Sequence, residues 1–383
     1  MKVKLATIEL KKAMKNITKI IRNDESKQVT YVTLTTKDKL LELDALGSNN
    51  SISINIEAEV IEPGKAITPS KVFYELINKL EDTDISLEVE NNKFMVKTQS
   101  IKAGLPLISE DNYTPANYEK VNENSNCTEV NIDPKLLSEA LFKTTPFCKY
   151  SNTEQNTPLK GILLKFSGKS FKAMATNVSM GVKIEAEIAE APEMTINLPP
   201  YSSNIIQDLC KETKQEKVKL MVNEKKTTVI FKTDNITYYS MQYSGAYPDL
   251  ERVFKQSINS NFITIDREKT LKSMERMNCF TEDKGSTIPL LMKFESENLL
   301  MNIKSAFGEN EEQLRYIEKH KDQDVTVAVN CNYITNSLRK CNTDNIDIYI
   351  NSKLQPLVIK SDNTNFIICA IRIANTEVSK AAA

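Results

Sequence analysis

The sequence predicts an α+β fold built from three copies of one domain, and three observations support this prediction. One pattern of strand, helix, strand, helix and β-hairpin occurs three times in the 383-residue chain, at a spacing of about 130 residues. The copies keep the order of elements and the apolar period while their side chains differ, which is typical of a triplicated fold. Hydrophobic residues make up 40% of the chain and charged residues 26%. No apolar run approaches the roughly 18 residues that a membrane span needs.

The first block of each copy is a short alternating strand that turns into an amphipathic helix. It covers residues 3–14, 130–141 and 263–274. In the first copy the apolar side chains Leu10, Ala13, Met14, Ile17 and Ile21 recur at helical spacing. This stripe is therefore expected to pack on a sheet, with the lysines on the other side of the helix.

The second block is again a strand followed by a helix, and the third is a β-hairpin. The second covers 66–80, 195–210 and 326–341, and the third covers 84–98, 217–233 and 345–361. We predict domains at 1–125, 126–257 and 258–380, with polar, irregular joints at 118–127 and 254–261. The three alanines at 381–383 fit nothing in the third copy and are expected to be a vector remnant.

The charge of the chain is unevenly distributed, although the net charge is only −1. The predicted helical spans 8–22, 70–81, 133–149, 201–214, 266–276 and 331–340 together carry +8, so the remainder carries −9. A positive face on the helices would suit a polyanion such as DNA. Lysines that merely solvate exposed helix faces would give the same count, so this observation leaves both interpretations open.

The sequence offers little that could carry catalysis. The only histidine, His320, lies in a charged segment expected to be a surface loop. The SGKS string at 167–170 resembles a phosphate loop, but Leu163 stands where the first glycine should be, and the segment reads as a hairpin turn. The acidic segment 308–318 lacks the spacing of a calcium loop and is expected to be a solvated loop. We therefore predict a binding protein without metal or cofactor.

The cysteines and the N-terminus indicate the cellular compartment in which the protein is expected. Seven scattered cysteines form no C-x-x-C pair, and the lysine-rich N-terminus has no secretion signal. Reduced thiols and a cytoplasmic location are the expectation.

Five segments in order resemble the bacterial β sliding clamp family, the β subunit of DNA polymerase III. They lie at 1–17, at 158–166 with 173–182, at 244–254, at 327–338 and at 366–373. The resemblance covers the chain to about residue 380. It implies clamp-type domains, each with two helices beneath β-sheets, and a head-to-tail homodimeric ring around duplex DNA. It also implies a processivity factor without an active site, which holds DNA independently of sequence and tethers polymerase, clamp loader and repair proteins through short peptides.

The resemblance assigns three groups of residues. The DNA channel would contain Lys12, Lys15, Lys19, Arg22, Lys27, Lys149, Arg276 and Arg339. The partner-peptide pocket would be lined by Leu159, Thr176, Val178, Ser179, Met180, Gly181, Pro248, Arg252, Val253, Asn330, Tyr333, Leu354, Pro356, Ile368, Cys369, Ala370, Ile371 and Arg372. The dimer interface would use the edge strand near 100–106, with Ile101 and Ala103, against the helix end near 277–280, with Cys279 and Phe280.

Two departures from the family pattern fall in the pocket. Residues 177–181 read Asn-Val-Ser-Met-Gly where the family has Asp-Gly-His-Arg-Leu, and Cys369-Ala370 stands where it has Met-Pro. The preferred peptide therefore stays open, as does the choice between a host's main clamp and a phage or plasmid copy. Two other functions also stay open: a paralogue that binds a clamp partner without encircling DNA, and an enzyme.

Overall fold

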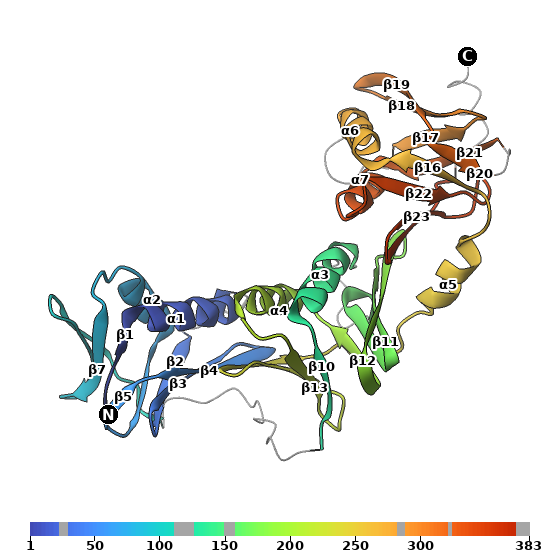
Figure 1. The fold of residues 1–383 in the computed structure, drawn as a ribbon. Coiled ribbons are helices and arrows are strands. Elements are labelled where there is room, and N and C mark those ends of the chain that lie inside the picture. The colour runs from blue at the N-terminus through green and yellow to red at the C-terminus, as the bar shows by residue number, and fades with distance from the viewer. Residues whose placement is uncertain (23–29, 111–125, 149–157, 282–287, 321–323, 373–383) are drawn as a thin grey trace. The chain divides into compact units, whose positions relative to one another are not determined.

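The computed structural model describes residues 1–22, 30–110, 126–148, 158–281, 288–320 and 324–372, with only the backbone described at 21 and 22 (Figure 1). The chain forms two compact units. Unit 1 contains Met1–Ser138 and Tyr201–Gln242, and unit 2 contains Glu139–Pro200 and Tyr243–Ala383. The division into three domains stays a prediction.

The first sheet of unit 1 has five strands in the order β5-β1-β7-β8-β9. They are β1 (Lys2–Ala6), β5 (Glu59–Glu62), β7 (Asp84–Glu90), β8 (Lys93–Lys97) and β9 (Lys102–Pro106). Strands β7 and β8 confirm the hairpin predicted at 84–98. Strand β9 pairs only with β8 in this sheet and therefore forms one of its edges.

The second sheet of unit 1 has eight strands in the order β10-β13-β14-β15-β4-β3-β2-β6. They are β2 (Tyr31–Lys37), β3 (Leu40–Leu46), β4 (Asn50–Glu57), β6 (Lys65–Pro69), β10 (Thr128–Ile132), β13 (Val218–Val222), β14 (Thr228–Lys232) and β15 (Ile236–Met241). The antiparallel β4–β15 ladder, from Ile54 opposite Ile236 to Asn50 opposite Ser240, joins strands from the first and second predicted repeats.

The helices of unit 1 begin where the sequence predicts. They are α1 (Thr7–Arg22), α2 (Ser70–Asn78) and all but the first residue of α4 (Pro200–Glu212), while α3 (Pro134–Thr144) begins in unit 1 and ends in unit 2. Helix α1 packs against α2 and against β3 and β4 (Figure 1). Its predicted apolar stripe is confirmed at Leu10, Ala13, Met14 and Ile17, which are all buried.

Unit 2 contains a seven-stranded sheet in the order β11-β12-β24-β23-β22-β16-β20 and a four-stranded sheet in the order β19-β18-β17-β21. The larger sheet consists of β11 (Ile162–Thr176), β12 (Met180–Leu198), β16 (Phe262–Asp266), β20 (Glu318–His320), β22 (Asn345–Tyr349), β23 (Leu357–Ser361) and β24 (Thr364–Ile368). The smaller sheet consists of β17 (Pro289–Phe294), β18 (Asn298–Ser305), β19 (Gly308–Arg315) and β21 (Val325–Asn330).

The helices of unit 2 cover these sheets. They are α5 (Leu250–Ser257), α6 (Arg267–Asn278) and α7 (Cys331–Leu338), with the short 3-10 helices η2 (Thr145–Phe147) and η3 (Pro158–Lys160). Helix α6 begins after Asp266, whose side chain accepts a hydrogen bond from the Lys269 N–H at 2.8 Å and so caps the helix. Helix α5 buries Leu250 and Phe254 against Leu163, Met174 and Ile367 of the larger sheet.

The structure corrects four expectations. Residues 167–170 form no hairpin turn, because β11 runs through them with a register irregularity at Gly168, whose φ is +54°. Residues 308–315 form strand β19 rather than a loop, and only 15% of the Glu312 side chain is exposed. His320 lies in β20, where its ring stacks on Phe262 at 4.1 Å between centroids. The joint predicted at 254–261 begins with the last turn of α5.

Among the described residues, no helix combines the length and the apolar character that crossing a bilayer requires.

Candidate functional site

Three lysines predicted to contact DNA lie on α1 in unit 1. The side chains of Lys12 and Lys15 are 63% and 64% exposed, whereas that of Lys19 is 19% exposed. Each lies near a carboxylate: Lys12 Nζ is 2.7 Å from Glu9 Oε1, Lys15 Nζ is 3.7 Å from Glu212 Oε1, and Lys19 Nζ is 3.0 Å from Asp208 Oδ2. Helix α4 thus supplies counter-charges to the basic side of α1.

The two arginines predicted to contact DNA lie in unit 2 and are also paired. Arg276 Nη2 lies 2.5 Å from Glu312 Oε2, and Arg339 Nη2 lies 2.8 Å from Glu275 Oε1. Both arginine side chains are more than half exposed. Of the remaining predicted contacts, Lys27, Lys149 and the side chain of Arg22 lie outside the described residues.

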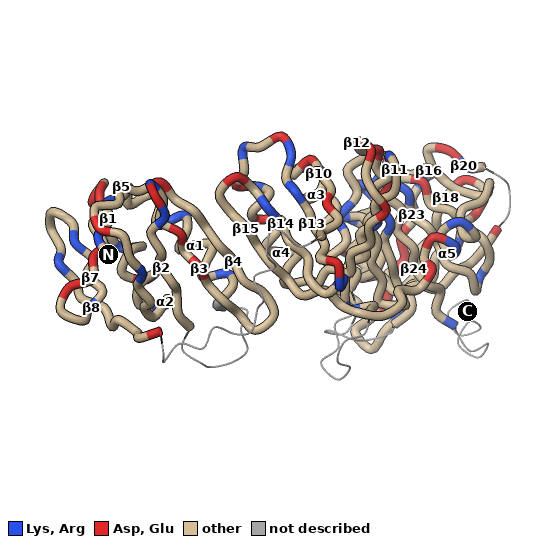
Figure 2. The backbone as a smooth tube through the Cα atoms, turned by 90° about the horizontal axis from the view of Figure 1, so that it is seen from below, with Lys and Arg blue, Asp and Glu red and all other residues tan. Residues whose placement is uncertain are grey.

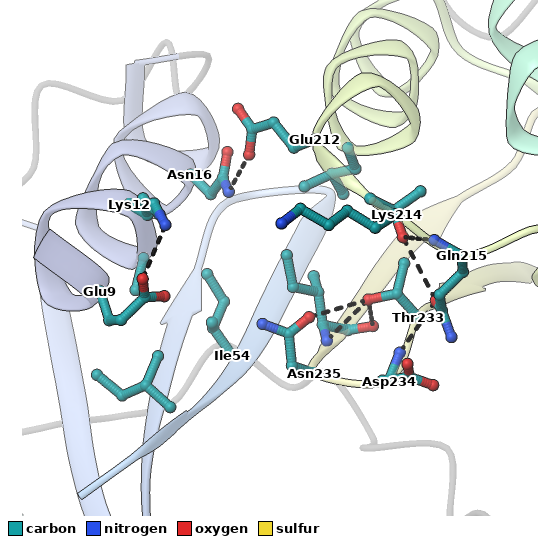
Figure 3. A pocket seen from close by; sticks show the side chains of 15 residues that line it. Glu9, Lys12, Asn16, Ile54, Glu212, Lys214, Gln215, Thr233, Asp234 and Asn235 are labelled. Carbon is teal, nitrogen blue, oxygen red and sulfur yellow. Dashed lines mark hydrogen bonds and ion pairs between the residues drawn. The ribbon is translucent and has the colours of Figure 1, made fainter.

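A cavity of about 480 Å³ lies in unit 1 beside this basic helix (Figure 3). It is lined by α1, β4, the end of α4 and the turn between β14 and β15. Figure 3 shows Lys12 bound to Glu9 and Asn16 bound to Glu212, where Asn16 Nδ2 donates to Glu212 Oε2 at 2.8 Å. Carboxylates and cations alternate around this cavity, so its walls do not form a surface of one sign.

Acidic and basic residues are also mixed across each unit as a whole. In Figure 2, basic and acidic positions are interspersed along the backbone of each unit. The charge separation inferred from the helical spans therefore coexists with acidic side chains placed directly beside the basic ones.

The predicted peptide-pocket residues all belong to unit 2, and β-pairing brings two of their segments together. Met180 pairs with Ile368, and Gly181 with Ile367, in the β12–β24 ladder. Beyond the ladder, the Cys369 N–H donates to the Ser179 carbonyl at 2.9 Å. The loop 176–181 and the chain after β24 therefore form one continuous surface.

A third pocket segment adjoins the first two. The Ile371 N–H donates to the carbonyl of Ala328 in β21 at 2.7 Å, next to Asn330, which caps α7 by accepting from the Asn332 N–H at 2.9 Å. Half-buried Tyr333 lies in the first turn of α7. The end of β24 is thus held close to the start of α7.

The segments around Leu159 and Pro248 are also connected. The Tyr247 hydroxyl donates to the Gly161 carbonyl at 3.3 Å, and Pro158 packs directly against Gly245. Pro248, Arg252 and Val253 are exposed at or on α5. Exposed Leu354 and half-buried Pro356 lie in the turn before β23.

Helix α5 is fixed electrostatically to β11. Glu251 accepts from Lys172 Nζ at 2.5 Å and from Lys165 Nζ at 3.0 Å. The hydrogen bond from Lys172, supported by Lys165, lowers the pKa of Glu251 to about 2. The carboxylate is therefore ionised at neutral pH and holds α5 beside the pocket residues.

One pocket residue has an unusual backbone. Val178 has a φ of +81° and is 64% exposed, although positive φ is unfavourable for a β-branched residue and costs about 1–3 kcal/mol. Asn177 Oδ1 accepts from the N–H groups of Ser179 and Met180 at 3.0 and 2.8 Å, and Thr176 Oγ1 accepts from the Val178 N–H at 3.0 Å. These bonds hold the turn in place.

The predicted dimer residues lie at two edges in different units. In unit 1, exposed Ile101 precedes the edge strand β9, which includes Ala103. In unit 2, exposed Cys279 and half-buried Phe280 follow α6, and a Cβ on Gly308 would contact the Phe280 ring at 3.5 Å. Phe280 therefore adjoins the edge strand β19, which the sequence does not reveal because strand 308–315 has almost no apolar alternation.

The described cysteines are free, and burial is the largest cause of the raised pKa of several thiols. The pKa rises to about 12 for Cys148, Cys210 and Cys331. Such thiols are protonated and unreactive at neutral pH. Within the described part of the chain, no three His, Cys, Asp or Glu side chains are grouped to hold a metal ion.

Known proteins resemble this chain over nearly its whole length. The family model described as DNA polymerase III beta subunit, N-terminal domain, matches residues 1–118. A protein of Rickettsia felis named Beta sliding clamp is 21% identical over 346 residues, which are 86% of this chain and 87% of that protein.

Solved structures show the same architecture. A putative DNA polymerase III beta subunit of Eubacterium rectale superposes with a TM-score of 0.87 at 17% identity, covering 97% of this chain and 100% of that one. A sliding clamp of Pseudomonas aeruginosa bound to griselimycin superposes with a TM-score of 0.85 at 16% identity and the same coverage. The predicted clamp-type α+β fold is confirmed.

Proposed function

We propose that this chain, a divergent member of the bacterial β sliding-clamp family, is a DNA sliding clamp that encircles duplex DNA and tethers a DNA polymerase to it. The observation that carries the proposal is that relatives named Beta sliding clamp match along most of both chains. Members of this family are processivity factors without catalytic activity, and this chain is likewise a binding protein rather than an enzyme. Its place of action would be the cytoplasm, where bacterial DNA is replicated.

DNA would be held by topology together with weak phosphate contacts. We assign these contacts to the predicted cations, of which Lys12, Lys15, Arg276 and Arg339 are exposed. The carboxylate partners of Lys12, Lys15 and Arg339 do not exclude this role, because an exposed ion pair contributes only about 0–1 kcal/mol and a phosphate can replace the carboxylate. Contacts of this kind carry no sequence information and so permit sliding.

Partner proteins would bind as short extended peptides on unit 2. The surface made by loop 176–181, the chain after β24 and the start of α7 offers the accessible apolar groups of Val178, Ala370, Ile371 and Tyr333 between polar side chains. A site that receives a few apolar anchor side chains needs such groups. The polymerase, the clamp loader and repair proteins are the proposed partners. The griselimycin complex of the Pseudomonas aeruginosa clamp shows that this fold accepts a ligand.

The ring would be a head-to-tail homodimer closed through the edge strands β9 and β19. An unpaired strand edge can pair with another chain, and in a cyclic dimer β9 of each subunit would pair with β19 of the other. The strands carry opposite charges: Lys102 lies on β9, whereas Glu309 and Glu311 lie on β19. Phe280, beside the start of β19, would supply an apolar contact.

The decisive experiment measures retention on DNA. The protein is loaded onto nicked circular DNA by a clamp loader and then washed at high salt. A closed ring should remain bound and should be released when the circle is linearised. Electrostatic binding alone would be lost, because affinity falls by about 10³–10⁵ between about 50 and 200 mM salt when 6–10 phosphates are contacted.

A triple replacement of Lys12, Lys15 and Lys19 by alanine should hinder loading and leave the retention of closed rings unchanged. The matched control replaces Lys39, Lys217 and Lys225, which are exposed beside strands rather than on α1, and should load normally. Equal retention on circular and linear DNA at high salt would contradict encirclement.

A further inference from the structure

We propose that Val178 determines the specificity of the peptide pocket: its exposed isopropyl group forms an apolar wall that selects a peptide with an apolar side chain opposite it. The inference rests on the proposed function, because it assigns a role within the proposed peptide site. It starts from Val178, whose backbone conformation is held by the hydrogen bonds of the turn but whose valine side chain takes part in none of them.

Val178 differs in kind from the other residues with positive φ. Among the described non-glycine residues these are Asp38, Asn91, Asn92, Lys226 and Asp362. Four of the five are Asn or Asp, whose short polar side chains tolerate this conformation. Val178 is the only β-branched residue in the group, so its backbone conformation disfavours the side chain that it carries.

Burial does not compensate for this strain. Val178 is 64% exposed, the highest value among the large apolar side chains of the described residues. The turn is held by the Asn177 and Thr176 side chains and by the backbone bond between Cys369 and Ser179, none of which uses the valine side chain. Glycine or asparagine would therefore keep every one of these bonds and relieve the strain.

The surroundings define the ligand chemistry. Cys369 Sγ lies 3.4 Å from the Val178 carbonyl, and half-buried Ala370 and Ile371 follow Cys369 along the chain. Two further exposed apolar side chains of unit 2, Val253 and Leu354, belong to the proposed pocket. An exposed, strained valine beside such a surface is expected where a partner covers it, since strain persists at functional sites when the surrounding structure fixes it.

The test uses Val178→Asn and Val178→Gly in the full-length protein. The probe is a ten-residue peptide copied from the C-terminus of the DNA polymerase encoded in the same genome. The panel also contains variants of this peptide in which one apolar residue at a time is replaced by serine. Calorimetry should show that both variants bind the parent peptide at least about thirtyfold more weakly, the size expected of a hot spot. The Tm of Val178→Asn should be equal to or above that of the wild type.

Specificity is tested with the serine peptides. Val178→Asn should bind one serine peptide as tightly as the wild type does, because the contact at that position is already lost. The control Asp362→Gly, which relieves positive φ in the turn between β23 and β24, should leave every affinity unchanged.

The outcomes separate this inference from the proposed function. If the wild type binds the peptide and both Val178 variants bind it equally well, the role of Val178 is overturned and the pocket stands. If both variants lose stability together with affinity, Val178 supports the fold and the inference also fails. If the wild type binds no peptide of the panel, the pocket and the role of Val178 both fall.

Discussion

Every described lysine or arginine proposed to contact DNA has a carboxylate within ion-pair distance, from 2.5 Å at Arg276 to 3.7 Å at Lys15. DNA must therefore displace an acidic neighbour at each contact. Weak, exchangeable contacts are suited to a protein that moves along DNA, because no single position on the duplex is strongly preferred.

Replacing Glu312 with Gln should strengthen DNA binding by releasing Arg276. The bidentate contact with Arg276 is the largest cause that lowers the Glu312 pKa to about 2. A glutamine cannot neutralise the arginine, so the variant should bind short duplex DNA more tightly. The dependence of log K on log salt should steepen by about 0.9 for one additional phosphate contact.

The same variant has a predicted pH dependence. The folded pKa of Glu312 lies below the value of about 4.3 expected when unfolded, so its contribution to stability is complete above that pH and is lost as the pH falls towards about 2. Urea unfolding at several pH values should show that the free energy of unfolding falls less for the Gln variant than for the wild type as the pH is lowered across this window. Glu295→Gln is the control, because Glu295 pairs with Lys293 and with no proposed DNA contact; equal salt slopes for both variants would contradict the role of Arg276.

Truncating Tyr333 to alanine, or replacing Leu159 with aspartate, should weaken binding of the polymerase-tail peptide by about 2 kcal/mol or more. Both side chains are half-buried in the proposed pocket, where an apolar anchor would lose contact area or meet a charge. Calorimetry measures the change. The control Asn332→Ala, at an exposed neighbouring position of α7, should bind normally, and unchanged affinity of the first two variants would remove the pocket from this surface.

Only part of this chemistry could be predicted from residue identities. Motif positions identify Tyr333 and Leu159, and lysine spacing identifies the basic side of α1. The partners of Lys15 and Lys19 could not be predicted, because Asp208 and Glu212 lie about 190 residues later in the chain. The positive φ of Val178 is equally hidden, since valine normally indicates extended backbone.

At the level of elements, local patterns predict most of the structure. Helix α6 begins after a capping aspartate, and three hairpins follow the second helices as expected. The sequence prediction fails at a strand that has no apolar period. Strand β19 alternates between exposed and half-exposed residues, so its pairing with β18, rather than an apolar period, determines its conformation.

Strands β9 and β19 provide a test of dimerisation. Lys102→Glu on β9 should dissociate the dimer by placing like charges opposite Glu309 and Glu311 of the partner. Adding Glu309→Lys and Glu311→Lys should restore it, because the charges are then exchanged. Light scattering measures the mass against the 43.3 kDa of one chain. Lys39→Glu is the control, and a dimer unaffected by Lys102→Glu would exclude this pairing.

For the whole molecule, length and repetition suggest three domains, whereas contacts group the described residues into two units. The reason is that hydrogen-bonded ladders cross the predicted boundaries: β4 pairs with β15, and β12 pairs with β24. The three-domain division stays a prediction, and these ladders join neighbouring members of it. Retention on circular DNA, the test of the proposed function, depends on these joints remaining closed.

The crossing ladders also constrain how the chain is made. On the ribosome, β4 cannot acquire its β15 partner until Met241 has left the exit tunnel, and β12 must wait for Ile368. The long β11–β12 hairpin is therefore exposed with an open, apolar edge while more than a hundred further residues are translated. Nascent chains stalled between these points carry an unpaired strand edge, and such an edge is open to pairing with other chains.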